Sequence, residues 1–252
     1  MQGTSRLAVS RLTGTVPRSI ISSPASIVRA KPLEPSSSPI YPSRQFHNAD
    51  KMAADGFLKL MTERRSFYPL NKEIPVTPER VMEIVKTAIH QTPSSFNSQS
   101  NRVLVLFGTD HEKLWDITAE DLRAVVPADH WEPTGKKMAM FKAAAGTVLF
   151  FDDQTVVESM QQRFGLYADR FPIWASQSNG MLQFALWTSL VAEGLGANLQ
   201  HYNPLIDEKV VAEWKVPAIW KLNAQLVFGG RTAPADPKTF EPIENIVKVS
   251  GI

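Results

Sequence analysis

The sequence predicts a layered domain of the α+β or α/β class, because three short buried strands are expected among several helices. The strands are apolar runs rich in β-branched and aromatic residues, at residues 102–108, 146–151 and 222–228. Segments with helical periodicity separate these runs, so helices are expected to cover the sheet. The apolar fraction of 43% supplies enough core-forming residues for such a domain.

Several helix boundaries can be recognised from their end residues. Thr77 is a good N-cap, Pro78 suits the first helical position, and Pro93 marks the end of the same helix. Asp110 is a plausible cap for the helix after the first predicted strand, and Asp207 for a short helix before the third. The remaining helices are expected at residues 52–64, 110–124, 134–144 and 207–214.

Residues 173–193 are apolar nearly all round the expected helix. A helix without a polar face is buried on all sides, so this segment predicts either a central core helix or a subunit interface. Gly194 and Gly196 follow it, and glycine is a frequent residue at a helix end. Residues 234–252 hold three prolines and little periodicity, which predicts an extended C-terminal arm.

The composition excludes several classes of site and partner. The chain has no cysteine, which excludes disulfides, cysteine nucleophiles and cysteine-ligated metals. The histidines lack metal-ligand spacing, and His47, His90, His111 and His130 are expected to be surface or capping groups. No apolar run is long enough for a membrane span. Residues 52–252 hold 20 basic and 23 acidic residues, so this part is not expected to bind nucleic acid.

The first 50 residues are expected to be disordered and to lie outside the fold, as a targeting peptide followed by a linker. Residues 1–33 contain five basic residues, many serines and no acid, which is typical of a mitochondrial transit peptide. Residues 32–42 form a Pro/Ser linker. The alternatives are a tail without an address, or translation from Met52, which would leave the protein in the cytoplasm. The domain itself is expected over residues 52–252.

Four short polar clusters interrupt the apolar body near expected helix or strand ends. Arginines offer forked donors to a phosphate, serine and amide groups hydrogen-bond, and glycine turns expose backbone N–H groups. Each cluster also has a structural interpretation as a helix end, a turn or a solvated strand end. Their order along one chain favours a phosphorylated, planar, hydrogen-bonding ligand. The clusters are Arg64-Arg65-Ser66, Pro93 to Gln99, Gly194 to Asn198 and Gly229-Gly230-Arg231.

The ordered segments RRSFYPL, TPSSFNSQSNRVLVLFG, GLGANLQHYNPLID and LVFGGR resemble the nitroreductase family of FMN-dependent oxidoreductases, and most of all its short fungal and bacterial subgroup. The likeness covers roughly residues 57–231. It implies an α+β, three-layer α/β/α fold with a mostly antiparallel central sheet and a long buried interface helix. It also implies an intertwined homodimer with FMN at the interface, and a ping-pong cycle with NADH or NADPH as electron donor.

The resemblance assigns the basic clusters to the phosphate end of FMN. Arg64, Arg65 and Ser66 match the first phosphate-and-ribityl motif, and Arg231 matches a C-terminal phosphate contact. The family commonly has a basic residue two positions after Ser66, near the pyrimidine edge of the flavin. This chain has Tyr68 there, so the group that balances negative charge at that edge is not defined by the sequence.

The other assignments concern the flavin ring. The flavin-contacting loop, expected in part to reach the partner's cofactor, matches Ser94, Ser95, Asn97 and Gln99. The segment beside the ring matches Leu199, Gln200, His201 and Tyr202. A backbone N–H near His201 is implied to face N5 of the flavin. His201 is the one histidine expected near the chemistry, where it could donate a proton. The alternative is a structural histidine at the subunit interface whose hydrogen bonds are satisfied there.

The implied activity is NAD(P)H-dependent reduction of nitroaromatic or quinone-like acceptors. Candidates to line a pocket for a small aromatic acceptor are Phe96, Trp115, Trp131, Phe164 and Tyr167. The departures at Tyr68 and at residues 200–202 keep a second hypothesis open, a flavin-binding regulatory protein that senses redox or lipid state and turns over slowly.

Overall fold

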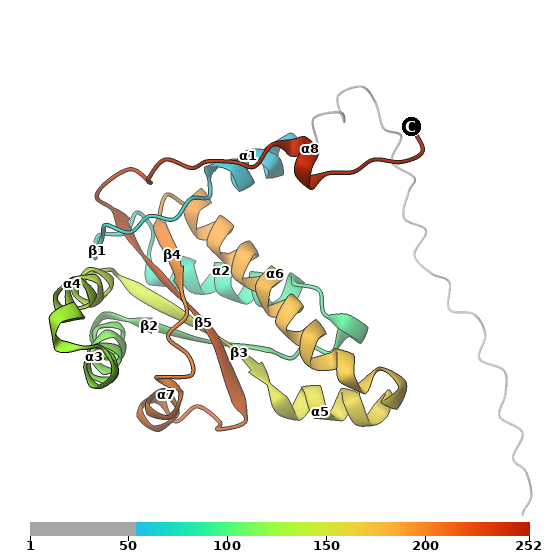
Figure 1. Cartoon of the computed structure of the whole chain (residues 1–252), viewed down its shortest axis with the longest axis horizontal. Helices are drawn as coiled ribbons and strands as arrows, with labels where there is room; N and C mark the ends of the chain where they lie inside the picture. The colour runs from blue at the N-terminus through green and yellow to red at the C-terminus, as the bar shows by residue number, and fades with distance from the viewer. Residues whose placement is uncertain (1–53) are drawn as a thin grey trace, which may run out of the picture. The chain divides into compact units, whose positions relative to one another are not determined.

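A computed structural model describes residues 54–252 and shows an antiparallel sheet between two layers of helices (Figure 1). The predicted transit peptide and linker lie outside the described residues, so both stay predictions. No helix in the described part is long and apolar enough to cross a membrane. The same residues contain no group of three or more histidines and acids that could hold a metal ion.

Five strands form the sheet. β3 (Gly146–Asp153) lies between β2 (Asn101–Phe107) and β5 (Trp220–Arg231), and both pairings are antiparallel. β5 also pairs with β4 (Gly196–Gln200) and, at its C-terminal end, with β1 (Leu70–Asn71). The three predicted strands are confirmed. β1 and β4 were not predicted, because two and five residues are too short to show a period of two.

Alternate side chains of the strands point into two separate cores, as the pleat of a strand requires. Leu149 and Phe151 of β3 face a core with Trp115 and Phe141, whereas Val148 and Phe150 face the opposite core. α3 (Gly108–Val125), α4 (Trp131–Lys142) and α7 (Asp207–Trp214) cover the first face. α2 (Pro78–Gln91) and α6 (Phe171–Ala192) cover the second. The three-layer α/β/α arrangement predicted from the resemblance is therefore confirmed.

α6 is buried on one side only within this chain. Leu182, Leu186 and Leu190 pack against the sheet with at most 1% exposure. Ile173 and Met181, on other sides of the helix, are 48% and 44% exposed. The expectation of burial on all sides fails for the single chain, because a sheet can contact only part of a helix's circumference.

α1 (Asp55–Glu63) and α5 (Gln154–Arg163) complete the helices of the body, and the short α8 (Ile243–Ile246) lies in the C-terminal arm. α1 buries none of its residues in this chain, although Phe57, Leu58 and Met61 give it an apolar side. From Asp236 to the C-terminus every residue is exposed. The predicted extended arm is thus present, and in the view of Figure 1 it passes below α1 before the short α8.

The helix ends test the capping predictions. Thr77 accepts a hydrogen bond from the Arg80 backbone N–H at 3.3 Å, as predicted for an N-cap. Asp110 is not a cap, since α3 begins two residues earlier and the Asp110 carboxylate accepts from Trp214 Nε1 at 3.1 Å. Asp207 is the first residue of α7 and not its cap. Gly194 follows α6 with a positive φ of 90°, as expected for a glycine at a helix end.

His111 is the clearest error among the histidine predictions. It was expected at the surface or at a cap, yet its side chain is fully buried in the first core. A histidine on an amphipathic helix cannot be assigned to the buried or exposed side without the helix phase, and α3 turns His111 towards β3.

Candidate functional site

The first polar cluster forms the wall of a small cavity of about 250 Å³, here called the cationic pocket. Arg64, Arg65, Ser66 and Tyr68, all predicted site residues, line one side of it. The C-terminal arm supplies the other side with Asp236, Pro237 and Lys238. Residues more than 160 positions apart in the sequence therefore share one pocket, and no sequence pattern pointed to Lys238.

The Arg-Arg-Ser segment is held beside β4 by backbone contacts. α1 ends at Glu63, and the Phe67 backbone N–H then donates to the Ala197 carbonyl at 3.0 Å. Asn198 Nδ2, which is buried, donates to the Phe67 carbonyl at 2.8 Å. Gly196 is needed for this approach, because a Cβ there would lie 2.5 Å from a methyl group of Leu70. Asn198, the last residue of the third polar cluster, is a positioning residue to which the sequence analysis gave no individual role.

The pocket carries a net positive charge, because three of its lining residues are basic and one, Asp236, is acidic. Among the described residues, none of Arg64, Arg65 and Lys238 forms an ion pair. Arg64 lies 4.5 Å above the ring of Trp187 on α6. Burial, and secondly the charge of Arg65, lower the pKa of Arg64, although an arginine stays charged in proteins. An anion would relieve the repulsion between these groups.

Arg231 lies next to this pocket but contacts protein carbonyls. Its Nε and Nη2 donate to the Leu195 carbonyl at 2.9 and 2.8 Å, and Nη2 also donates to the Val191 carbonyl at 2.9 Å. Burial lowers its pKa, and Glu63 partly opposes this. Val191 and Trp187 are one turn apart on α6, so Arg231 and Arg64 contact neighbouring turns of one helix. In this chain Arg231 thus caps one carbonyl of the last turn of α6, that of Val191, and binds the Leu195 carbonyl in the turn that follows the helix.

The predicted flavin-contacting loop has a strained backbone. Ser94 Oγ accepts from the Gln99 backbone N–H at 2.9 Å, and Ser95–Asn97 form a 3₁₀ turn. Phe96, Asn97 and Gln99 all have positive φ angles, of 55°, 52° and 52°. A bulky residue such as phenylalanine rarely adopts this conformation, and strain of this kind concentrates at functional sites.

This loop and the cationic pocket lie at different places along α6. Ser178 Oγ donates to the Pro93 carbonyl at 2.8 Å and accepts from Asn101 Nδ2 at 3.0 Å, which fixes the loop near the middle of the helix. Val191, the contact of Arg231, is 13 residues further, or about 20 Å at 1.5 Å per residue. One chain therefore does not bring Ser94, Ser95, Asn97 and Gln99 to the cationic pocket.

The predicted segment beside the flavin ring leaves the end of β4. Leu199 and Gln200 are half-buried, and Gln200 Nε2 donates to Asn198 Oδ1 at 2.8 Å. His201 is exposed, with its imidazole free of ion pairs to described residues. Tyr202 packs its ring against Trp115, with centroids 5.7 Å apart, and burial raises the pKa of Tyr202 to about 12. Tyr202 is thus engaged with the core, and Leu199, Gln200 and His201 are the candidates for ligand contact in this segment.

Five aromatic rings gather around the strained loop and are here called the aromatic cluster. Phe96 is at its centre, with its ring centroid 4.6 Å from that of Phe164, and the other members are Tyr167, Phe171 and Trp174. Phe96 is nevertheless 55% exposed. Two other candidates for an acceptor pocket lie elsewhere: Trp115 is in the core and Trp131 lies under Arg123.

Comparison with known proteins decides the family. Residues 61–230 match the nitroreductase family. The chain belongs to the nitroreductase family. HBN1 and FRM2, nitroreductase-like proteins of Saccharomyces cerevisiae, are 38% and 35% identical over 195 residues, or 77% of this chain and 96% of each relative.

A solved member of the family from Lactococcus lactis, the nitroreductase CinD, has the same fold. In complex with nicotinic acid it is 47% identical to this chain with a TM-score of 0.73, and in complex with 4-nitrophenol 45% identical with a TM-score of 0.71. Each comparison covers 77% of this chain and all of the CinD chain. The chain described here, as a member of the nitroreductase family, is accordingly an oxidoreductase.

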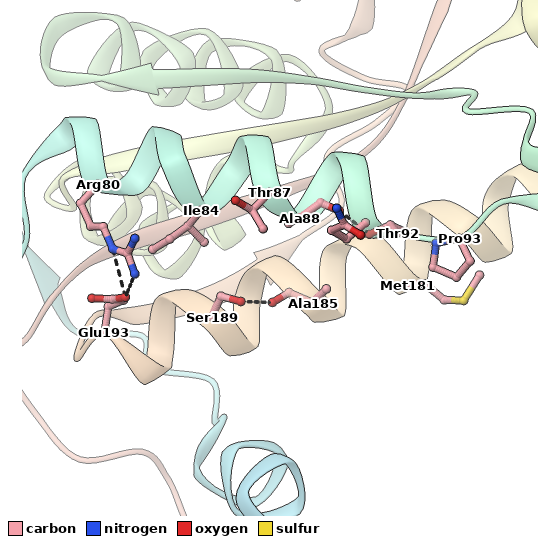
Figure 2. Close-up of a pocket in the computed structure, with 11 residues that line it drawn as sticks. Arg80, Ile84, Thr87, Ala88, Thr92, Pro93, Met181, Ala185, Ser189 and Glu193 are labelled. Carbon is pink, nitrogen blue, oxygen red and sulfur yellow. Dashed lines mark hydrogen bonds and ion pairs between the residues drawn. The ribbon is translucent and has the colours of Figure 1, made fainter. Parts of the chain in front are cut away.

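A cavity of about 440 Å³ in this nitroreductase family member contains none of the predicted site residues. It lies between α2 and α6, with Ile84, Ala88 and Met181 among its apolar walls (Figure 2). Arg80 closes one end by an ion pair of 2.6 Å with Glu193. Its apolar walls and its position on the exposed side of α6 suit contact with another protein surface better than polar chemistry.

Proposed function

We propose that the protein is an FMN-dependent oxidoreductase that takes electrons from NADH or NADPH and passes them, in a ping-pong cycle, to nitroaromatic or quinone-like acceptors. The observation that carries the proposal is the cationic pocket. Its arginines and lysine have no ion-pair partner in the described chain, and a serine hydroxyl and a tyrosine phenol lie beside them. This donor set fits a phosphate ester, which binds through charge-assisted hydrogen bonds.

The pocket fits one end of FMN and not the whole molecule. At about 250 Å³ it takes a phosphate and part of the ribityl chain. Arg64, Arg65 and Ser66 would hold the phosphate end, and Leu199, Gln200 and His201 continue from it along β4 towards the ring position. When bound, FMN supplies the hydride chemistry, and the protein supplies orientation and charge.

His201 is proposed as the group that holds or delivers a proton beside the ring. Its exposure allows exchange with solvent, and its neighbours Gln200 and Tyr202 are fixed by hydrogen bonds to Asn198 and Gln225. The hydrogen bond of the Tyr202 backbone N–H restrains the adjacent backbone at residue 201, which a donor to the flavin N5 requires. Tyr202 itself is half-buried, with its ring packed against Trp115, and is assigned no contact with the ligand.

An aromatic acceptor is supported by the aromatic cluster. A half-exposed phenylalanine with other rings behind it offers a stacking surface for a planar ring. The complexes of CinD with nicotinic acid and 4-nitrophenol concern aromatic molecules of this size in a protein 45–47% identical to this chain. The cluster surrounds the loop expected to contact flavin, which would put acceptor and cofactor side by side.

A homodimer is part of the proposal. The serine loop is about 20 Å along α6 from the Arg231 contact, so a loop from a second copy is needed to complete the site. The surfaces for a second copy are the apolar side of α1, the exposed side of α6 with the cavity of Figure 2, and the arm. Analytical ultracentrifugation of the purified protein tests this, and a monomer at micromolar concentration would contradict it.

Visible spectroscopy of the purified protein tests the activity. A yellow protein that NADH or NADPH bleaches, and that a nitro compound restores, is expected. A yellow protein without turnover would support the regulatory hypothesis instead, and a colourless protein that does not take up added FMN would contradict both.

The location in the cell rests on the N-terminal residues alone. We infer import into mitochondria from the basic, serine-rich and acid-free composition of residues 1–33. A fluorescent protein fused after residue 51 is expected in mitochondria, and diffuse cytoplasmic fluorescence would contradict the inference.

A further inference from the structure

The predicted flavin-contacting loop, residues 93–99, has a conformation that its own sequence does not favour. Phe96, Asn97 and Gln99 have positive φ angles without being glycine. Such a backbone costs energy and persists only where surrounding contacts hold it in place. Ser178 of α6 holds the start of the loop, and a second contact is needed at its end.

Arg102 of β2 supplies this second contact with both terminal nitrogens of its guanidinium group. Nη1 donates to the Gln99 carbonyl at 2.8 Å and to the Asn101 carbonyl, also at 2.8 Å. Nη2 donates to Asp153 Oδ2 at 2.9 Å, in an ion pair whose carboxylate side chain is only 13% exposed. The guanidinium also lies 5.7 Å from the ring centre of Trp220. Because the donors of a guanidinium form a rigid planar fork, the position of Asp153 determines where the Gln99 carbonyl is held.

Asp153 is itself fixed, because it is the N-cap of α5. Its Oδ1 accepts from the Thr155 backbone N–H at 3.0 Å. At the other end of α5, the ring of Phe164 packs against that of Phe96 in the loop, with centroids 4.6 Å apart. The loop therefore contacts both ends of one helix, through the polar contact at its own end and the aromatic contact at its middle.

We propose that Arg102 is a positioning residue, which holds the flavin-contacting loop in its ring-binding shape through the Gln99 carbonyl. The inference rests on the proposed FMN function and adds a residue to which no flavin contact is assigned. Gln99 is an assigned contact, so a change at Arg102 displaces a residue that touches the ring. Without the guanidinium the strained residues relax, and only a fraction of the molecules keeps the binding shape. The apparent affinity for flavin falls by that fraction.

The test compares Arg102→Ala and Arg102→Lys with the wild type and with Arg123→Ala, all in the full-length protein. Arg123 of α3 is the matched control, because its guanidinium also lies over a tryptophan ring, 4.1 Å from the centre of Trp131, and is outside the loop. FMN and riboflavin, which has the ring and ribityl chain without the phosphate, are titrated by equilibrium dialysis. The melting temperature of each flavin-free protein is measured as well.

We expect Arg102→Ala to weaken the binding of FMN and of riboflavin by the same factor, roughly 10-fold, because both ligands carry the ring that the loop contacts. Arg102→Lys retains a cation for Asp153 but not the fork, so it should keep the wild-type melting temperature and still show most of the loss in affinity. The visible circular dichroism of bound FMN, which reports the surroundings of the ring, should change in both variants. Arg123→Ala should change neither the affinities nor the circular dichroism.

The outcomes separate this inference from the function on which it rests. A wild type that binds FMN, with equally tight Arg102 variants, would overturn the role of Arg102 and leave the FMN function standing. A loss for FMN without a loss for riboflavin would also overturn it, because the residue would then act on the phosphate end. Full affinity in Arg102→Lys, or a melting temperature that falls together with its affinity, would assign Arg102 to charge balance or to the fold instead. A wild type that binds neither ligand would contradict the FMN function itself.

Discussion

The cationic pocket and the polar network around His111 use polar side chains in opposite ways. In the network, His111 Nδ1 lies 2.9 Å from Thr147 Oγ1, Nε2 lies 3.1 Å from the Phe141 carbonyl, and Trp115 Nε1 donates to Thr147 at 3.1 Å. All of these groups are buried and each has a partner. In the pocket, three cations have no ion-pair partner in the described chain and remain open to solvent.

The difference separates polar groups that maintain the fold from those that can bind a ligand. A buried polar group without a partner is costly, so a chain that places His111 and Thr147 in a core must also satisfy them. Cations that keep contact with solvent, such as the half-buried Arg64 and Arg65, bear a smaller cost and can stay unpaired until an anion arrives. Mutations in the first region should therefore change stability, and mutations in the second should change ligand binding.

Removal of both arginines from the pocket should have the largest effect. Arg64→Ala combined with Arg65→Ala removes two charge-assisted contacts to the FMN phosphate, each worth about 1.5–3 kcal/mol. FMN affinity should fall by about two to four powers of ten, as measured by equilibrium dialysis. The melting temperature of the FMN-free protein should change little. Unchanged flavin retention would show that the pocket is not the phosphate site.

Removal of the hydroxyl at the centre of the His111 network should have the reverse pattern. Thr147→Val leaves His111 Nδ1 and Trp115 Nε1 buried without a partner, at a cost of about 2–4 kcal/mol in the free energy of unfolding. The loss in the free energy of unfolding is measured by urea denaturation. Thr134→Val is the matched control, because the Thr134 hydroxyl is exposed and its hydrogen bond to the His130 carbonyl is long, at 3.4 Å. Similar losses for the two variants would contradict the distinction.

The same network predicts a dependence of stability on pH. Burial is the main cause that lowers the pKa of His111 to about 4, from 6.5 when unfolded. Between these values the unfolded chain binds a proton that the folded chain does not, so stability should fall as the pH drops from 6.5 to 4. The loss is at most about 3 kcal/mol.

Proton NMR can isolate this histidine from the carboxylates that also titrate in acid. The ring resonances of His111 should stay constant from pH 7.5 to 5 and move only near pH 4. The carbonyl of Phe141 can only accept, so Nε2 should carry the proton throughout this range. A midpoint near 6.5 would show that the side chain is not buried as described.

The smallest effect is expected at the aromatic cluster. Phe96→Ala removes the half-exposed ring and should raise KM for an aromatic acceptor a few-fold, in line with about 0.5–1.5 kcal/mol for one aromatic contact. The rate of flavin bleaching by NADH should not change. Phe240→Ala, which removes an exposed ring from the arm, is the control for acceptor KM. An unchanged KM in Phe96→Ala would show that the aromatic cluster is not part of the acceptor site.

Local patterns were enough to predict much of this molecule. The strands 102–108, 146–151 and 222–228, the helix start at Thr77 and the helix end at Gly194 were all predicted, because each depends on residues within a few positions of one another. The order of the polar clusters was enough to indicate the family, since motif order is a property of the linear chain.

Only the tertiary structure decided which of these residues meet. It paired β1 and β4 with β5, buried His111, engaged Arg231 with the end of α6, and brought Lys238 to Arg64 and Arg65. These outcomes depend on the sheet pairing and on the rotation of each helix, which bring together residues that are distant in sequence. Local sequence determines which elements form, whereas long-range packing determines which side chains remain unpaired and able to bind.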